Sequence, residues 1–197
     1  FTAAGTNNIK VRTYHYEGYI TNEPRFPLNI KTRQVETHID DEEATMTVDD
    51  ITLRIKRATA EFTFEADGKI LTGCGFRNVG YIRADKQPAT MRPEEGYLVD
   101  NWTPYMVNEL MLKPGETIYG FGEQFTAFVK NVQVVDIWNE DGATASDVAY
   151  KNVPFYMSSE GYGVFVDSTS PVSFEVASEK VENVSFAVKG EAARYHV

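Results

Sequence analysis

Short runs in which apolar and polar residues alternate recur along most of this 197-residue chain. The clearest are Ile51–Lys56 and Ala60–Glu65, and Asp67-Gly68 separates the second of these from a further run, Ile70–Thr72. A period of two places every second side chain on one face of an extended strand. Asp-Gly between two such runs is typical of a type I′ hairpin turn. Because no longer segment shows helical periodicity, we expect an all-β fold, an antiparallel β-sandwich.

The same pattern predicts further strands. They are Leu28–Arg33, Tyr105–Leu112, Glu116–Gly120, Val132–Ile137, Val153–Met157, Gly163–Val166, Val172–Val176 and Val184–Val188. Tyr81–Asn101 contains two prolines and little alternation, which indicates an irregular connection, and Thr144–Tyr150 is interpreted as one short helical turn. Neither side of the connection looks able to close a core alone, so we expect 1–197 to form one domain.

The composition excludes several classes of function. A net charge of −10 opposes binding to nucleic acid and to anionic membrane surfaces. The longest apolar runs are only a few residues, too short to span a bilayer. The chain has one cysteine, Cys74, so an intrachain disulfide is excluded, and we expect a buried small side chain there. This scarcity of cysteine favours a cytoplasmic protein.

Metal and cofactor sites have no sequence signal. The three histidines, His15, His38 and His196, are far apart and lack the spacing of metal ligands. The acidic run Asp40–Glu43 lacks the alternating ligands of a calcium loop and is interpreted as a solvated turn. Gly120-Phe121-Gly122 lacks the third glycine and the helix of a dinucleotide loop. These glycines instead indicate close backbone approach or unusual φ at a strand end.

A long polar and aromatic-rich insert separates the strands in the middle of the chain, and such inserts are usually functional or disordered. It carries four aromatic residues (Phe125, Phe128, Trp138, Tyr150) among five carboxylates (Glu123, Asp136, Glu140, Asp141, Asp147). Aromatic faces can stack on pyranose rings while carboxylates accept hydrogen bonds from hydroxyl groups. The composition therefore favours contact with a sugar.

Four motifs in order carry a family resemblance. They are Y-G-F-G-E-Q-F at Tyr119–Phe125, W-N-x-D-G at Trp138–Gly142, Y-K-N-V-P-F-Y at Tyr150–Tyr156 and G-Y-G-V-F-V at Gly161–Val166. The chain thereby resembles the N-terminal domain of glycoside hydrolase family 31, in particular its bacterial α-xylosidase branch. The resemblance is dense from Met106 to Val197 and looser before it.

The resemblance implies a galactose mutarotase-like β-sandwich that precedes a catalytic (β/α)₈ barrel. Both catalytic aspartates of the family lie in the barrel, so no catalytic residue is assigned to this chain. The implied partners are the chain's own barrel and an α-linked oligosaccharide or xyloside. Related enzymes often form oligomers, so a homo-oligomer is a further partner to test. No cofactor is implied.

Carried over by position, Asp141 would reach over the barrel mouth and bind the sugar on the leaving-group side. Its alternative role is that of a turn-forming Asp-Gly. Trp138 beside it is a candidate sugar platform, with core packing as the alternative. We expect Glu123, Phe125 and Tyr150 to support the loop. Lys151 and Asn152 are further anchors, and Lys151 would pair with a nearby acid.

Two other functions remain open at this point. A free-standing carbohydrate-binding β-sandwich would hold sugar without cleaving it, and its isolated chain would show measurable glycan affinity. An aldose mutarotase-like enzyme would need a histidine and a carboxylate converging on one concave face, which three scattered histidines disfavour.

Overall fold

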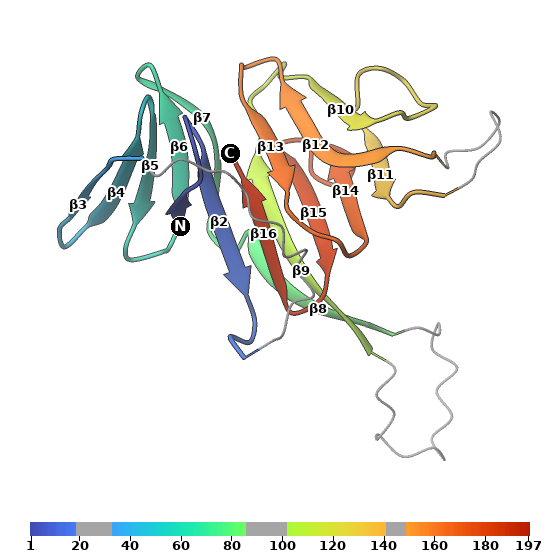
Figure 1. Ribbon diagram of the computed structural model, residues 1–197, viewed down its shortest axis with the longest axis horizontal. Coiled ribbons are helices and arrows are strands. Elements are labelled where there is room, and N and C mark those ends of the chain that lie inside the picture. Colours follow the sequence, from blue (N-terminus) through green and yellow to red (C-terminus); the bar gives the residue numbers. More distant parts are fainter. Residues whose placement is uncertain (19–32, 86–101, 141–148) are drawn as a thin grey trace, which may run out of the picture.

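The computed structural model describes residues 1–18, 33–85, 102–140 and 149–197 (Figure 1). Every regular element in these ranges is a β-strand. Within the same ranges no helix is long and apolar enough to cross a membrane. The strands form three sheets, and neighbouring strands in each sheet are antiparallel.

The first sheet has the order β1 (Thr2–Ala3), β2 (Ile9–Tyr14), β16 (Ala192–His196), β13 (Gly163–Val166), β12 (Asn152–Ser158), β10 (Ile118–Gly122). The second has the order β11 (Gln133–Ile137), β14 (Val172–Val176), β15 (Asn183–Lys189), β9 (Trp102–Met111), β8 (Val79–Asp85). The third has the order β3 (Val35–Ile39), β4 (Glu43–Val48), β5 (Ile51–Lys56), β6 (Phe62–Ala66), β7 (Lys69–Cys74).

The inner faces of the first and second sheets pack against each other. Phe121 of the first sheet lies 4.7 Å, ring to ring, from Phe174 of the second. Tyr195 and Phe186 make a second contact between these sheets, an edge-on ring pair at 5.2 Å. All four side chains are fully buried or nearly so. Burial of such large apolar side chains contributes roughly 1.5–3 kcal/mol each, so these contacts stabilise the packing of the two sheets.

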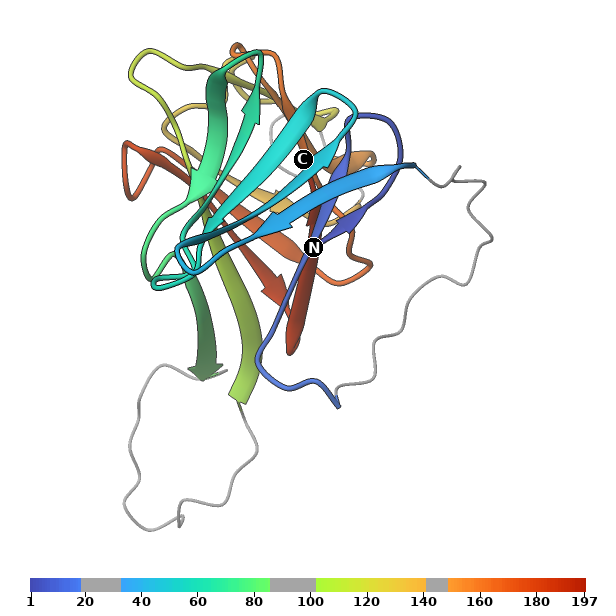
Figure 2. The same ribbon diagram turned by 90° about the vertical axis from the view of Figure 1, so that its left-hand side faces the viewer.

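The third sheet lies beside this sandwich (Figure 1), faces the viewer in Figure 2, and shares the same core. Its inward side chains Leu53 and Phe64 are fully buried in the same hydrophobic cluster. The hydroxyl of Thr72 on β7 donates a 2.8 Å hydrogen bond to the carbonyl of Met111 at the end of β9. One continuous core therefore underlies all three sheets.

The expected all-β, antiparallel sandwich is confirmed. The predicted strands Ile51–Lys56, Gly163–Val166 and Val172–Val176 coincide with β5, β13 and β14. At the predicted hairpin turn Asp67 and Gly68 have φ of 51° and 71°, the two positive values that a type I′ turn requires. The turn joins β6 to β7.

The prediction of an irregular connection at Tyr81–Asn101 was wrong for its first five residues. They belong to β8, which pairs with β9 through seven successive residues from Val79↔Asn108 to Asp85↔Trp102. Residues 86–101 lie outside the described part of the chain, as do 28–32 of the predicted strand Leu28–Arg33 and 144–148 of the predicted helical turn. The strands β1, β2, β3, β4 and β16 were also not predicted.

The acidic run Asp40–Glu43 forms the turn between β3 and β4, as expected. One carboxylate oxygen of Asp40 accepts hydrogen bonds from the backbone N–H groups of Glu42 and Glu43, each 2.9 Å long. These bonds favour the charged carboxylate and lower the pKa of Asp40. The run therefore has a structural role in closing the hairpin.

Candidate functional site

The site begins at the end of β10, where three residues in succession have positive φ. The values are 122° at Gly120, 68° at Phe121 and 84° at Gly122. A Cβ atom at Gly122 would lie 2.2 Å from the carbonyl oxygen of Lys151, and one at Gly120 would lie 2.7 Å from that of Phe155. The expectation of close backbone approach and unusual φ is confirmed. The irregularity brings the chain after β10 directly against the start of β12.

The side chain of Asn152 joins three chain segments at this point. Its amide nitrogen donates to the carbonyl oxygens of Trp138 and Ala149, at 2.7 and 2.9 Å. Its amide oxygen accepts from the side chain of Gln124. Its backbone N–H donates a 2.6 Å hydrogen bond to the side-chain oxygen of Asn139. Asn152 is only 9% exposed, so these bonds replace water at a buried junction.

The loop between β11 and β12 therefore leaves and returns at one place. Asn139 and Ala149 form a parallel β-bridge, and the backbone N–H of Glu140 donates to the carbonyl of Ala149 at 3.1 Å. The intervening residues 141–148, with Asp141 and Asp147, lie outside the described residues. The proposed contact of Asp141 with sugar thus stays a prediction. The structure does show the residue before Asp141: the backbone of Glu140 is held at the loop base by its hydrogen bond to Ala149.

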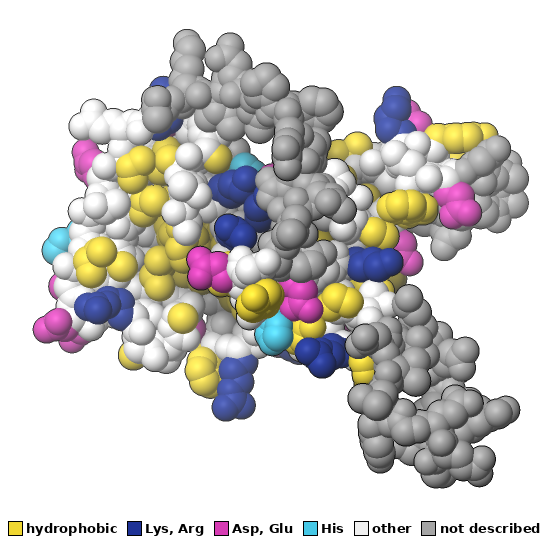
Figure 3. Space-filling view, turned by 60° about the horizontal axis from the view of Figure 1, so that its bottom comes forward, with side chains coloured by type: hydrophobic (Ala, Val, Ile, Leu, Met, Phe, Trp, Pro, Cys, Tyr) yellow, Lys and Arg dark blue, Asp and Glu magenta, His cyan; other side chains and the backbone are white. Residues whose placement is uncertain are grey.

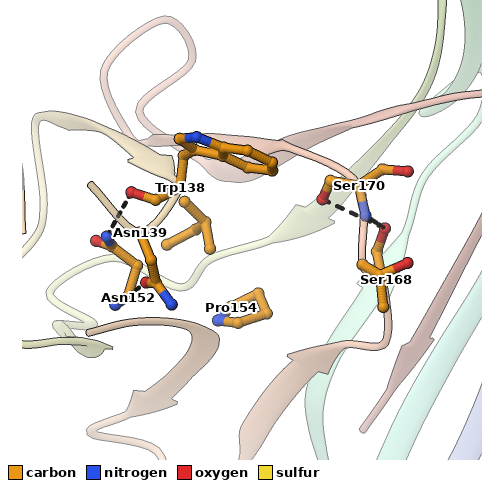
Figure 4. Close-up of a pocket in the computed structure, with 8 residues that line it drawn as sticks. Trp138, Asn139, Asn152, Pro154, Ser168 and Ser170 are labelled. Atoms are coloured by element: carbon orange, nitrogen blue, oxygen red, sulfur yellow. Dashed lines mark hydrogen bonds between the residues drawn. The ribbon is translucent and has the colours of Figure 1, made fainter. Parts of the chain in front are cut away.

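A cavity of about 300 Å³ lies beside this junction (Figure 4). The indole ring of Trp138 covers one side of it and Pro154 lies across from the ring, while Ser168 and Ser170 line the far side. Trp138 is 56% exposed, so its ring is open to a ligand. The volume lies at the lower end of the range for small-molecule sites. An aromatic face with amide and hydroxyl groups around it is suited to a polar, ring-shaped ligand.

The residues expected to support the loop lie around its base. Glu123 forms an ion pair with Lys151 at 3.5 Å, the pairing expected for Lys151. Both side chains are largely exposed, so the pair contributes little to stability. Phe125 is 53% and Tyr150 is 63% exposed. Figure 3 shows hydrophobic side chains at the surface on the right-hand part of the molecule, where β10–β12 and their loops lie.

Two polar residues of the junction, Gln124 and Asn139, were not singled out from the sequence. Both lie within motifs that carry the family resemblance, Tyr119–Phe125 and Trp138–Gly142, but no role was assigned to either. Lys130 was also missed. It is 4% exposed, and its ammonium donates to the hydroxyl of Thr126 at 2.9 Å, while burial lowers its pKa. This hydrogen bond lies within the segment that connects β10 to β11.

The described residues hold no cluster of three or more metal-ligating side chains. Of the five carboxylates in the insert, Glu123, Asp136 and Glu140 are described, and all three are exposed.

Two relatives extend over nearly the whole chain. This chain is 41% identical over 198 residues to an α-xylosidase of Emericella nidulans, and the match covers 96% of this chain and 25% of that protein. It is 39% identical over 199 residues to an α-xylosidase of Lactiplantibacillus pentosus, covering 100% of this chain and 24% of that protein. The chain thus spans about a quarter of the length of the curated relatives it matches.

Solved structures share the fold at low sequence identity. A glycoside hydrolase 31 dextranase of Flavobacterium johnsoniae, complexed with isomaltotriose, matches with a TM-score of 0.74 at 19% identity over 96% of this chain and 22% of that chain. A glycoside hydrolase 31 α-xylosidase from a soil metagenome, complexed with xylose, matches with a TM-score of 0.69 at 18% identity over 98% of this chain and 29% of that chain.

The family model that matches residues 1–175 describes the glycosyl hydrolase 31 N-terminal galactose mutarotase-like domain. With that match and the strand order above, the chain belongs to glycoside hydrolase family 31 as its N-terminal β-sandwich domain.

Proposed function

We propose that this domain serves a retaining α-glycosidase of the α-xylosidase type. It packs on the catalytic barrel and contributes the Glu123–Asn152 segment, in particular the loop at 138–152 that follows β11, to the rim of the sugar-binding site. The observation that carries the proposal is the cavity at the loop base, with the exposed ring of Trp138 at its side. The proposed preference for α-xylosides rests on the two relatives of 41% and 39% identity, both of which are α-xylosidases.

The junction at Asn152 supports the role of the loop. A loop that presents groups to a substrate must hold them in place, because binding depends on preorganised geometry. The bonds from Asn152 to Trp138 and Ala149 fix both ends of the loop within one buried network. Asp141 is two residues after Asn139 in the chain, and the side chain of Asn139 belongs to the same hydrogen-bond network.

The substrate preference is tested with the full-length protein and aryl α-glycosides. We expect hydrolysis of an aryl α-xyloside with a higher kcat/KM than that of the matching aryl α-glucoside. A preference for the glucoside would overturn the xylosidase assignment. The isolated 197-residue chain should show no turnover above a heat-inactivated sample, since no catalytic pair is assigned within it.

The open cavity also favours a second candidate, a carbohydrate-binding module that works without catalysis. A calorimetric titration of the full-length protein and of this chain with an α-linked xylosyl disaccharide separates the two. Binding by the chain, together with no hydrolysis by the full-length protein, would favour the module. Hydrolysis by the full-length protein would exclude it.

A further inference from the structure

The outward face of the first sheet is divided into a polar half and an apolar half. On β2 and β16 most outward side chains are polar or charged, at Lys10, Arg12, Arg194 and His196, and the last outward pair is Tyr14 and Ala192. Such alternation, apolar inside and polar outside, is the rule for an antiparallel sheet with one face in water. This half of the sheet therefore follows the rule.

The other half, formed by β10, β12 and β13, departs from it. Its outward positions carry Tyr119, Val153, Phe155, Met157 and Phe165, and Phe128 of the following loop lies on Tyr119 with a ring distance of 5.1 Å. We call these six residues the outer apolar patch. Across strands Tyr119 lies directly opposite Met157, and Phe155 lies opposite Phe165. The patch is thus continuous over three neighbouring strands.

The patch is accessible in this chain. Phe128 is 80% and Met157 is 53% exposed, and Val153 and Phe165 are more than a third exposed. Isolated exposed apolar residues need no explanation, but a contiguous patch marks an interaction surface. A polar border adjoins it, because the His196 ring lies 6.0 Å from that of Phe165 and Lys10 forms an ion pair with Asp167 at 3.3 Å. An apolar centre with a polar rim is the usual anatomy of an interface.

We propose that the outer apolar patch is the surface on which the catalytic part of the full-length enzyme packs. This inference rests on the proposed function. Two observations favour this occupant over any other. About three quarters of the length of the α-xylosidase relatives lies outside the region that this chain matches. The patch also lies next to the loop base, since Val153 directly follows Asn152 on β12, although their side chains point to opposite faces of the sheet.

This placement explains how one domain can both pack on the catalytic part and contribute a loop to the sugar-binding site. The body that covers Val153, Phe155 and Met157 meets the sandwich next to the loop base at Asn152. The two described ends of the loop, 138–140 and 149–152, then lie at the edge of the interface. A body docked on the polar half of the sheet would lie beyond β13, farther along the sheet from the loop.

Oxidation of Met157 by hydrogen peroxide in the full-length protein tests the proposal. Methionine sulfoxide forms fastest at accessible thioethers, and peptide mass spectrometry follows each site separately. The matched control is the methionine introduced by Val181→Met, in the exposed turn between β14 and β15, where Val181 is 78% exposed. Each oxidation rate is divided by the rate of the same methionine in the denatured protein. On this scale we expect Met157 to oxidise at least about tenfold more slowly than the control. Equal rates would overturn the proposal.

Two further measurements separate the alternatives. Protection of Met157 that disappears on dilution, as the protein dissociates in light scattering, would assign the patch to a second copy and overturn the proposal. Protection that is independent of concentration supports packing within one molecule. The aryl α-xyloside assay is read on the same sample. Activity without protection would overturn the packing surface alone, and protection without any α-glycosidase activity would overturn the proposed function alone.

Discussion

The side chain of Asn152 holds the backbone of Trp138: its amide nitrogen donates a 2.7 Å hydrogen bond to the Trp138 carbonyl oxygen. The same nitrogen binds the carbonyl of Ala149 at 2.9 Å. One buried NH₂ group therefore positions the aromatic wall of the cavity and the returning end of the loop together.

Asn152→Asp tests this relationship, because it keeps the acceptor oxygen and removes both donors. The Trp138 and Ala149 carbonyls would lose their partner and face a carboxylate. We expect the free energy of unfolding to fall by about 2–4 kcal/mol, since an unsatisfied buried polar group costs roughly 1–3 kcal/mol. Urea denaturation measures the free energy of unfolding of the native protein and of each variant. The control is Lys151→Ala, which removes only an exposed ion pair and should cost less than about 1 kcal/mol. Equal losses in both variants would show that Asn152 does not organise the junction.

Two glycines with nearly the same backbone angle test the close approach of β10 to β12. Gly122 has φ of 84° and Gly161 has φ of 88°. A Cβ atom at Gly122 would lie 2.2 Å from a carbonyl oxygen, whereas one at Gly161 has nothing within 4 Å. Gly161→Ala should cost about 1–2 kcal/mol from the positive φ alone. Gly122→Ala should cost at least about 2 kcal/mol more, because backbone must move. Similar thermal unfolding midpoints for both variants would contradict this account.

Cys74 makes stability depend on alkaline pH. Burial raises the pKa of its thiol from 9.0 to about 12. Between these two values the unfolded chain releases the proton and the folded chain keeps it. This contribution to stability is therefore fully present below pH 9 and is lost as pH rises toward 12. Relative to Cys74→Ala, the native protein should lose about 1.4 kcal/mol more per pH unit in this window. Denaturant titrations from pH 8 to 10.5 measure the difference, and parallel curves would count against it.

The sequence predicted best the strands whose two faces differ sharply. Ile51–Lys56 alternates aliphatic with polar residues, and its buried positions are Ile51 and Leu53. β2 was missed because only Ile9 and Val11 point into the core and its third inward position is Thr13. β3 is an edge strand with four of its five residues exposed, so it carries no apolar stripe to detect. Local alternation reports burial, and strands with little one-sided burial give little signal.

The site shows the same limit. Phe125, Trp138 and Tyr150 stood out because aromatic residues in a polar insert are unusual. Gln124 and Asn139 did not, because their role depends on Asn152, which is 28 residues from Gln124 in the chain. Pairings between distant strands were equally hidden: β16 joins β2 through His196↔Lys10. Such contacts depend on the complete fold and have no local pattern.

Trp138 and Trp102 are the two tryptophans of the chain, and they are 56% and 54% exposed. In the full-length protein Trp138→Ala should raise KM for an α-linked xylosyl disaccharide by about 5- to 30-fold, from the loss of about 1–2 kcal/mol of apolar contact with the sugar. Trp102→Ala, at the start of β9, should leave KM unchanged. Trp138→Phe keeps an aromatic face and should fall between native and alanine. Similar KM values for the two alanine variants would remove Trp138 from the site.

Asp141 lies outside the described residues, one position after Glu140, whose backbone N–H is bound to Ala149. The family resemblance implies that its carboxylate binds the sugar on the leaving-group side. A hydrogen bond from a charged group contributes roughly 1.5–3 kcal/mol, so Asp141→Ala should lower kcat/KM for a disaccharide by roughly 10- to 150-fold. An aryl glycoside has no hydroxyl groups at that subsite and should lose much less activity.

Asp141→Asn keeps one acceptor oxygen and should therefore retain an intermediate kcat/KM for the disaccharide. The ratio of disaccharide to aryl-glycoside activity is the decisive quantity, because misfolding lowers both rates together and leaves the ratio unchanged. An equal loss for both substrates would mean that Asp141 shapes the loop, since the loop ends share the junction at Asn152. No change for either substrate would make Asp141 a turn residue of the Asp-Gly pair and would leave Trp138 as the sugar contact to pursue.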